Sequence, residues 1–252
     1  MRIEVKDVSM TYQSPEGEVD ALRNVSFDVE DGSFVSIVGP SGCGKSTLLS
    51  LIAGIEQPTS GDILFDGERL QRPSEKIGLM PQRDQLFEWR TIRRNVLLGP
   101  EIRGENTLLR QAEVGRMLEQ YALSGFTKKT PSQLSGGMRQ RCALIRTLAV
   151  EPEVLLLDEP FSALDYQTRL AVSADISDII RKTHKTALLV THDISEAISM
   201  SDVIVVLSHR PGAVRSIHRL DRFRGIGAMQ RRSMGEFQEL FRVIWGELDV
   251  NV

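Results

Sequence analysis

The distribution of apolar and polar residues along the chain predicts an α/β protein. The early apolar positions alternate with polar ones around turns at 16–17 and 31–32, which suggests an antiparallel layer. By contrast, the segments 154–157 and 187–190 are uninterrupted apolar runs, which are typical of strands buried on both faces of a parallel sheet. Taken together, the patterns predict strands near 2–8, 25–30, 34–38, 62–65, 76–80, 154–158, 186–191, 202–207 and 213–219.

Two further regions have helical periodicity. The stretch from about 91 to 133 carries Val114, Met117, Leu118 and Tyr121 at helix spacing and no strong strand, so it predicts a helical insertion between core strands. A second stripe predicts an amphipathic helix over about 230–248. Its apolar positions are Phe237, Leu240, Phe241, Ile244, Trp245 and Leu248. Packing on the core is the default explanation of that stripe, and partner binding is the alternative.

Length and composition narrow the class of protein. A chain of 252 residues can bury a substantial core, and we expect a single domain over 1–252 with a helical subdomain at about 88–150. The net charge of −3 disfavours DNA or RNA as the main partner. Cys43 and Cys142 form no disulfide framework or metal-ligand spacing, which favours a reducing cytoplasm. No apolar run approaches the roughly 20 residues of a membrane span, and the N-terminus has no signal-peptide core, so we expect no insertion into a bilayer.

A glycine-rich loop carries the strongest chemical signal. The sequence Gly39-Pro40-Ser41-Gly42-Cys43-Gly44-Lys45-Ser46-Thr47 fits G-x-x-x-x-G-K-[ST], and it lies between a predicted strand and a predicted helix. Its glycines let successive N–H groups surround phosphate oxygens, while Lys45 can reach the β- and γ-phosphates and Ser46 can ligate Mg²⁺. The alternative is a plain glycine turn between a strand and a helix. The full match in this context favours binding of a nucleoside triphosphate.

Two other segments supply groups suited to phosphate chemistry. The apolar run at 154–157 ends in Asp158, placed to hold Mg²⁺, and Glu159, placed to polarise an attacking water. A solvated strand end would also carry acids, but adjacent acids in a chain with a phosphate loop favour catalysis. In addition, Ser135, Gly136 and Gly137 open a predicted helix, and its N-terminus is a second anion site.

At these residues the chain resembles the ATP-binding subunits of ABC transporters. Leu134 to Met138, followed by Arg139-Gln140, is similar to the signature motif of that family. In the family, the signature of one subunit contacts the γ-phosphate of ATP held by the loop of the other, so the resemblance implies a homodimer in the ATP state. It also implies an α/β fold with a P-loop NTPase core, an antiparallel β subdomain and a helical subdomain.

The remaining motifs follow in the family's order, over residues 2–215. Gln82 resembles the Q-loop glutamine, which senses Mg²⁺ and the γ-phosphate, and His192 resembles the switch histidine. The segment 162–165, ending in Asp165, is similar to the D-loop, and Tyr12 resembles the aromatic that stacks on adenine. The resemblance thus implies Glu159 and His192 as catalytic residues and Ser46, Gln82 and Asp158 as ligands of Mg²⁺. It implies an ATP site made of Tyr12, Gly39, Pro40, Ser41, Gly42, Cys43, Gly44, Lys45, Ser46, Thr47, Gln82, Ser135, Gly136, Gly137 and Asp165.

Features of the loops point to a branch of the family. The turn Arg210-Pro211-Gly212 is similar to one in importer subunits for nitrate, sulfonate and taurine, whereas Phe87-Glu88-Trp89 departs from the commoner leucine-proline-tryptophan. Sugar-importer subunits usually continue into a regulatory β domain, and because this sequence stops at Val252 we expect the chain not to belong to that subclass. Beside Gln82, the side chains of Phe87, Trp89 and Ile92 are expected to form the apolar surface on which a permease docks, and local core packing is the alternative explanation for some of them.

The sequence therefore predicts an ATP-hydrolysing subunit that powers solute import through a separate membrane permease. The resemblance also implies an extracytoplasmic solute-binding protein in the complex, and a peripheral location on the cytoplasmic face of the plasma membrane. An ATPase of an export or lipid-extraction complex is the first alternative, since it shares the fold and the chemistry. A soluble ABC ATPase acting on DNA or ribosomes is the second, but the coiled coils, zinc cysteines or second ATPase unit of such proteins are not found in this sequence.

Overall fold

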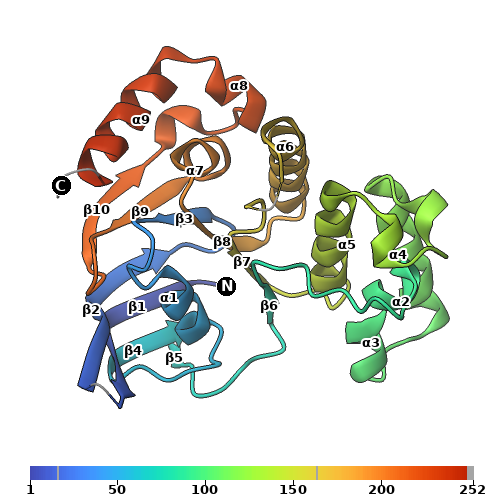
Figure 1. Cartoon of the computed structure of the whole chain (residues 1–252), viewed down its shortest axis with the longest axis horizontal. Coiled ribbons are helices and arrows are strands. Elements are labelled where there is room, and N and C mark those ends of the chain that lie inside the picture. The colour runs from blue at the N-terminus through green and yellow to red at the C-terminus, as the bar shows by residue number, and fades with distance from the viewer. Residues whose placement is uncertain (16, 163, 249–252) are drawn as a thin grey trace.

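Two β-sheets organise the molecule (Figure 1). The computed structural model describes residues 1–15, 17–162 and 164–248. A smaller sheet has the order β2-β1-β4-β5, and a larger one has the order β10-β9-β3-β8-β7-β6. The strands are β1 Ile3–Ser14, β2 Gly17–Val29, β3 Phe34–Val38, β4 Ser60–Phe65, β5 Glu68–Arg69, β6 Ile77–Met80, β7 Val154–Asp158, β8 Thr186–Thr191, β9 Val203–Leu207 and β10 Val214–Arg219.

The larger sheet is parallel from β6 to β9, and only β10 runs antiparallel to its neighbour β9. Every residue of β3 and β8 is buried, as are the first four residues of β7. The prediction that 154–157 and 187–190 lie inside a parallel sheet is therefore confirmed. Because the carboxyl ends of parallel strands share one edge, the loops that follow β3, β6, β7 and β8 all open at that edge.

The smaller sheet confirms the expected antiparallel layer, but its strands are longer than the sequence pattern predicted. Strand β1 continues past residue 8 to Ser14, and Tyr12 pairs with Val19 of β2. Met10 and Tyr12 continue the period-two pattern from Val8, so the sequence pattern is compatible with a longer strand than the one predicted. Backbone pairing with β2, through several register shifts, holds the segment 9–14 extended.

Helices cover both sheets, and α2 to α5 form a helical subdomain to one side (Figure 1). The α-helices are α1 Lys45–Ile52, α2 Ile92–Val96, α3 Leu98–Ile102, α4 Leu108–Gln120, α5 Gly136–Leu148, α6 Tyr166–Lys182, α7 Ile194–Met200, α8 Ala228–Arg232 and α9 Gly235–Leu248. Short 3₁₀ turns lie at Ser124–Phe126, Pro131–Gln133 and Asp221–Phe223. None of the helices in the described part of the chain combines the length and the apolar character that a bilayer span requires.

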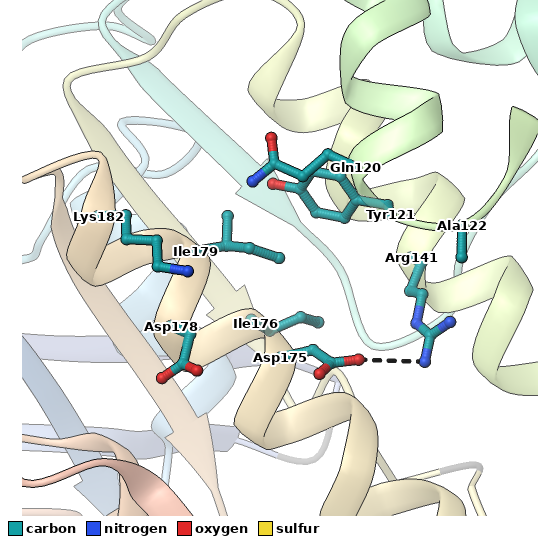
Figure 2. Close-up of a pocket in the computed structure, with 9 residues that line it drawn as sticks. All are labelled: Gln120, Tyr121, Ala122, Arg141, Asp175, Ile176, Asp178, Ile179 and Lys182. Carbon is teal, nitrogen blue, oxygen red and sulfur yellow. Dashed lines mark hydrogen bonds and ion pairs between the residues drawn. The ribbon is translucent and has the colours of Figure 1, made fainter.

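A small cavity of about 230 Å³ lies where the helical subdomain meets α6 (Figure 2). Tyr121 and Arg141 line it from the helical subdomain, and Asp175 and Ile179 line it from α6. The Nη2 atom of Arg141 is 3.2 Å from the Oδ2 atom of Asp175. Burial raises the pKa of the Tyr121 hydroxyl, so the phenol is neutral at physiological pH. The ion pair between Arg141 and Asp175 links α5 directly to α6.

The C-terminal segment differs from the single helix predicted over about 230–248. The chain forms α8 and α9, separated at residues 233–234. The guanidinium of Arg231 is fully buried and donates hydrogen bonds to the carbonyls of Ile198, Ser201 and Ile226, which ties α8 to the region around α7. Phe237 and Ile244 of α9 are buried in the cluster formed with α7 and β9, whereas Trp245 is 55 % exposed. Core packing thus explains most of the apolar stripe.

Candidate nucleotide-binding and hydrolysis site

The glycine-rich loop lies at the carboxyl end of β3 and leads directly into α1. Gly42 and Gly44 have φ angles of +75° and +99°, which L side chains rarely adopt. A Cβ atom on Gly44 would lie 2.8 Å from the carbonyl oxygen of Ala21, so a side chain at this position would also clash with β2. The two glycines therefore allow a backbone path whose N–H groups surround a central anion.

Lys45, the first residue of α1, places a positive charge inside the loop. Its Nζ atom donates hydrogen bonds to the carbonyl oxygens of Gly39 and Pro40, at 2.8 and 2.9 Å, and the residue is 6 % exposed. Cys43, by contrast, is 1 % exposed, and burial raises the pKa of its thiol. The thiol is therefore suited to packing and not to nucleophilic attack.

A cavity of about 390 Å³ opens beside the loop. This volume lies within the range of roughly 300–1,000 Å³ that small-molecule sites occupy. The predicted residues Tyr12, Gln82 and Glu159 line it, together with the loop residues Ser41, Gly42, Gly44, Lys45, Ser46 and Thr47. Ala21 and Arg210 also line it, although the sequence analysis did not assign either to the site. Gly39, Pro40 and Cys43 shape the loop without lining the cavity.

Tyr12 occupies its place through contacts with α1 and the turn that follows it. The hydroxyl donates a hydrogen bond to the Oε2 atom of Glu56 over 2.6 Å, and it lies 3.5 Å from the Oγ1 atom of Thr47. Burial, together with the Glu56 carboxylate, raises the pKa of this hydroxyl. The sequence gave no signal for Glu56, because its link to Tyr12 depends on the approach of β1 to α1.

Asp158 and Ser46 bring oxygen ligands together at the edge of the large sheet. The Oγ atom of Ser46 donates a hydrogen bond to the Oδ1 atom of Asp158 over 3.2 Å. Burial raises the pKa of Asp158, and the charge of Glu159 adds to this effect. Hydroxyl and carboxylate oxygens are the ligands that Mg²⁺ prefers, so the residues fit this ion. No cluster of three or more His, Cys, Asp or Glu side chains suited to a metal occurs among the described residues.

Glu159 is fixed both by its backbone and by its carboxylate. Its φ angle is +41°, and its N–H group donates to the carbonyl of Val190 over 2.8 Å. One carboxylate oxygen, Oε2, accepts a hydrogen bond from Nε2 of Gln82 at 3.1 Å and lies 3.2 Å from Nδ1 of His192. Three predicted residues from the loops after β6, β7 and β8 therefore meet at one oxygen atom. Such an arrangement can orient a carboxylate as a general base for water.

Four other predicted residues do not reach this cavity within one chain. Ser135 caps α5, and its Oγ accepts a hydrogen bond from the N–H of Met138; both Ser135 and Gly136 are exposed. Gly137 is buried where α5 packs on α6. A Cβ atom at this position would lie 2.8 Å from Cγ2 of Thr168. Asp165 caps α6 and is exposed, while Ala163 of the expected D-loop lies outside the described residues. The signature and the phosphate loop of the same chain thus belong to separate surfaces.

The loop after Gln82 is linked to α5, the helix that Ser135 begins. Arg139 of α5 contacts Oδ2 of Asp84 at 2.7 Å and Oε1 of Glu88 at 2.9 Å. Burial alone would raise the pKa of Asp84, but the hydrogen bonds from Arg139 and from the N–H group of Leu86, together with the charges of Arg139 and Arg146, lower this pKa. Arg146 adds hydrogen bonds to the carbonyls of Asp84 and Gln85. Glu88, which departs from the commoner pattern, therefore takes part in this link.

Comparisons with known proteins show clear similarities over most of the chain. The family model described as ABC transporter matches residues 22–162. The chain is 45 % identical over 250 residues to an uncharacterized ABC transporter ATP-binding protein, YtlC of Bacillus subtilis, covering 98 % of this chain and 95 % of the relative. It is 39 % identical over 219 residues to the taurine import ATP-binding protein TauB of Roseobacter denitrificans, covering 86 % and 82 %. The dimeric, post-hydrolysis structure of the ATP-binding cassette MJ0796 with ADP and Pi has a TM-score of 0.75 and 32 % identity, covering 86 % of this chain and 98 % of that one.

Proposed function

Because this chain belongs to the ABC transporter family of ATP-binding, ATP-hydrolysing proteins, we propose that it powers solute import through a separate membrane permease. The observation that carries the proposal is the meeting of Gln82, Glu159 and His192 beside the phosphate loop. The taurine import relative favours import over export within the family. A purified chain that hydrolyses ATP and co-purifies with a permease supports the proposal, and the absence of ATP hydrolysis would refute it.

Each residue near Glu159 has a defined part in the proposed hydrolysis. The loop amides and Lys45 bind the phosphates, and Ser46, Asp158 and Gln82 would hold Mg²⁺, which neutralises phosphate charge when bound. Gln82 and His192 hold the Oε2 atom of Glu159, and neither contact uses the second carboxylate oxygen. That oxygen can accept a proton from a water aligned with the γ-phosphate. His192 therefore positions the carboxylate of Glu159, and it also contacts the γ-phosphate.

The separation of the signature from the loop supports a head-to-tail dimer. Ser135 and Gly136 are exposed at the N-terminus of a helix of 13 residues, where N–H groups and the helix dipole favour an anion. The γ-phosphate held by the loop of a second copy supplies such an anion. We therefore propose that ATP joins two subunits, that Asp165 contributes near the shared site, and that hydrolysis separates them.

A groove of about 690 Å³ beside Gln82 provides a docking surface for the permease. Asp84, Leu86 and Arg139 are among the residues that line it. Next to it, the rings of Phe87 and Trp89 pack with centroids 4.8 Å apart, and Trp89 is 79 % exposed. The expectation for Ile92 was wrong, because this side chain is fully buried in the core of the helical subdomain. The surface therefore rests on the two aromatic rings.

The groove also explains how docking is coupled to ATP. Asn95 is fully buried, and its side chain exchanges hydrogen bonds with the backbone of Phe87 and donates to the carbonyls of Arg90 and Thr91. This network holds the aromatic segment rigid, and the Arg139 contacts join it to α5. A permease helix seated here would move with the signature helix, on the cytoplasmic face of the membrane and opposite an extracytoplasmic solute-binding protein.

Replacing Trp89 with alanine is expected to disrupt docking without impairing the isolated ATPase. The ring lies largely in solvent, so its removal should change stability little, whereas an exposed aromatic anchor often dominates an interface. The measurement is the amount of permease that co-purifies with the variant. Trp245→Ala is the matched control, since that tryptophan is also exposed but lies on α9. Unchanged co-purification and transport with Trp89→Ala would contradict the docking proposal.

Replacing Tyr12 with alanine is expected to weaken ATP binding several-fold. Stacking of an aromatic ring on adenine contributes on the order of 1 kcal/mol, which corresponds to about a five-fold change in affinity. Titration calorimetry with ATP measures the effect. Tyr12→Phe keeps the ring and loses only the contacts of the hydroxyl with Glu56 and Thr47, so it should bind nearly as well as the wild type. Equal losses in both variants would show that the hydroxyl, and not the ring, supports the site.

A further inference from the structure

The turn between β9 and β10 packs directly on the phosphate loop. The N–H group of Gly212 donates to the carbonyl of Ala21, and the carbonyl of Gly212 accepts from Arg23, both over 2.9 Å. A Cβ atom on Gly212 would lie only 2.1 Å from the carbonyl oxygen of Cys43, so no larger residue fits against the loop here. Strand β2 and the phosphate loop therefore fix the backbone that carries Arg210.

The Arg210 side chain extends from this fixed turn to the nucleotide cavity. It lines the cavity together with Ala21 and Gly44, and it is exposed. Its Nε atom donates a hydrogen bond to the carbonyl of Asp20 over 3.2 Å, which orients the guanidinium. Within the described part of the chain, the guanidinium forms no ion pair with a carboxylate and its terminal nitrogens form no hydrogen bond. The planar fork of donors is thus free to bind a ligand.

We propose that Arg210 is an additional nucleotide-binding residue, whose guanidinium contacts the polyphosphate of ATP and ADP. A guanidinium matches phosphate oxygens in charge and in geometry, and Lys45 supplies only one positive charge within the loop. Gly44 directly precedes α1, where loop amides can bind the α- and β-phosphates, and Ala21 of β2 lies beside it. Because ATP and ADP share these phosphates, Arg210 serves both nucleotides. This inference rests on the proposed function.

Titration calorimetry of the full-length chain, in EDTA to prevent hydrolysis, tests the contact. Arg210→Ala and the neutral Arg210→Gln should each weaken both ATP and ADP about 3- to 10-fold, an effect reduced by exposure of the site. Arg210→Lys should keep most of the affinity, and the loss should shrink at high salt because the contact is ionic. Arg219→Ala is the matched control: it removes the same charge from β10, but its partner is Glu30, outside the cavity.

The possible results separate this inference from the function on which it rests. Wild-type binding that is lost in Lys45→Ala establishes the ATP site independently of Arg210. With that site established, wild-type affinity in Arg210→Ala or Arg210→Gln would overturn the inference, as would a loss confined to ATP. Thermal unfolding of each variant should match the wild type, because the substitution removes one exposed hydrogen bond. A wild-type chain that binds no ATP would overturn both proposals.

Discussion

Replacing Glu159 with glutamine is expected to stop ATP hydrolysis while leaving ATP binding intact. Glutamine keeps the size of the side chain but loses the negative charge and the basicity that a general base needs. The turnover rate should fall by about 10²- to 10⁴-fold, the usual contribution of general-base catalysis. The hydrogen bond from Gln82 to the side-chain oxygen can persist, so the site should keep its shape. Steady-state phosphate release measures the rate, and calorimetry measures binding.

The same variant tests the proposed dimer. Because ATP stays intact, Glu159→Gln with ATP should elute at twice the monomer mass, whereas the same protein with ADP should remain monomeric. Glu153→Gln is the matched control, since Glu153 lies just before β7 and Glu159 just after it, and its exposed ion pair with Lys76 is far from the loop. Wild-type hydrolysis by Glu159→Gln would overturn the catalytic assignment. Formation of that dimer without nucleotide would instead overturn the ATP-dependent mechanism.

Replacing Lys45 with alanine is expected to abolish useful ATP binding. The ammonium group is held within the loop by two carbonyl oxygens, so it is already oriented toward the phosphates. A charge-assisted hydrogen bond contributes about 1.5–3 kcal/mol, so affinity should fall roughly 10- to 100-fold. Calorimetry with ATP gives the affinity directly. In the Glu159→Gln background, the added Lys45→Ala change should also prevent the ATP-dependent dimer.

Lys185→Ala is the matched control for Lys45→Ala. The ammonium group of Lys185 also donates to a backbone carbonyl, but this residue does not line the nucleotide cavity. Its Nζ atom donates to the carbonyl of Pro152 over 2.6 Å, and it lies before β8, away from the carboxyl ends of the strands. It should bind ATP normally. If Lys45→Ala also bound ATP normally, the glycine-rich loop would not be the phosphate site. Circular dichroism excludes unfolding as a cause of any loss.

The sequence determined the features whose physical cause is local. Successive amides and the start of one helix bind phosphate, so the loop 39–47 is contiguous and could be recognised directly. Burial on both faces likewise favours unbroken apolar runs inside β7 and β8, and the runs at 154–157 and 187–190 identified the parallel sheet. Ser135 caps its helix through a neighbouring N–H group, so its position at a helix N-terminus also followed from nearby residues.

Only the tertiary structure decided which distant residues meet. The sheet places β7 between β6 and β8, which brings Gln82, Glu159 and His192 to one oxygen atom although Gln82 and Glu159 are 77 residues apart in the chain. Likewise, Arg210 faces the cavity because its turn packs on β2 and the loop, and Ile92 is buried because the helical subdomain closes over it. Pairing and burial between distant segments set these positions. The free energy of this pairing and burial depends on contacts between distant segments, which no local pattern of residues records.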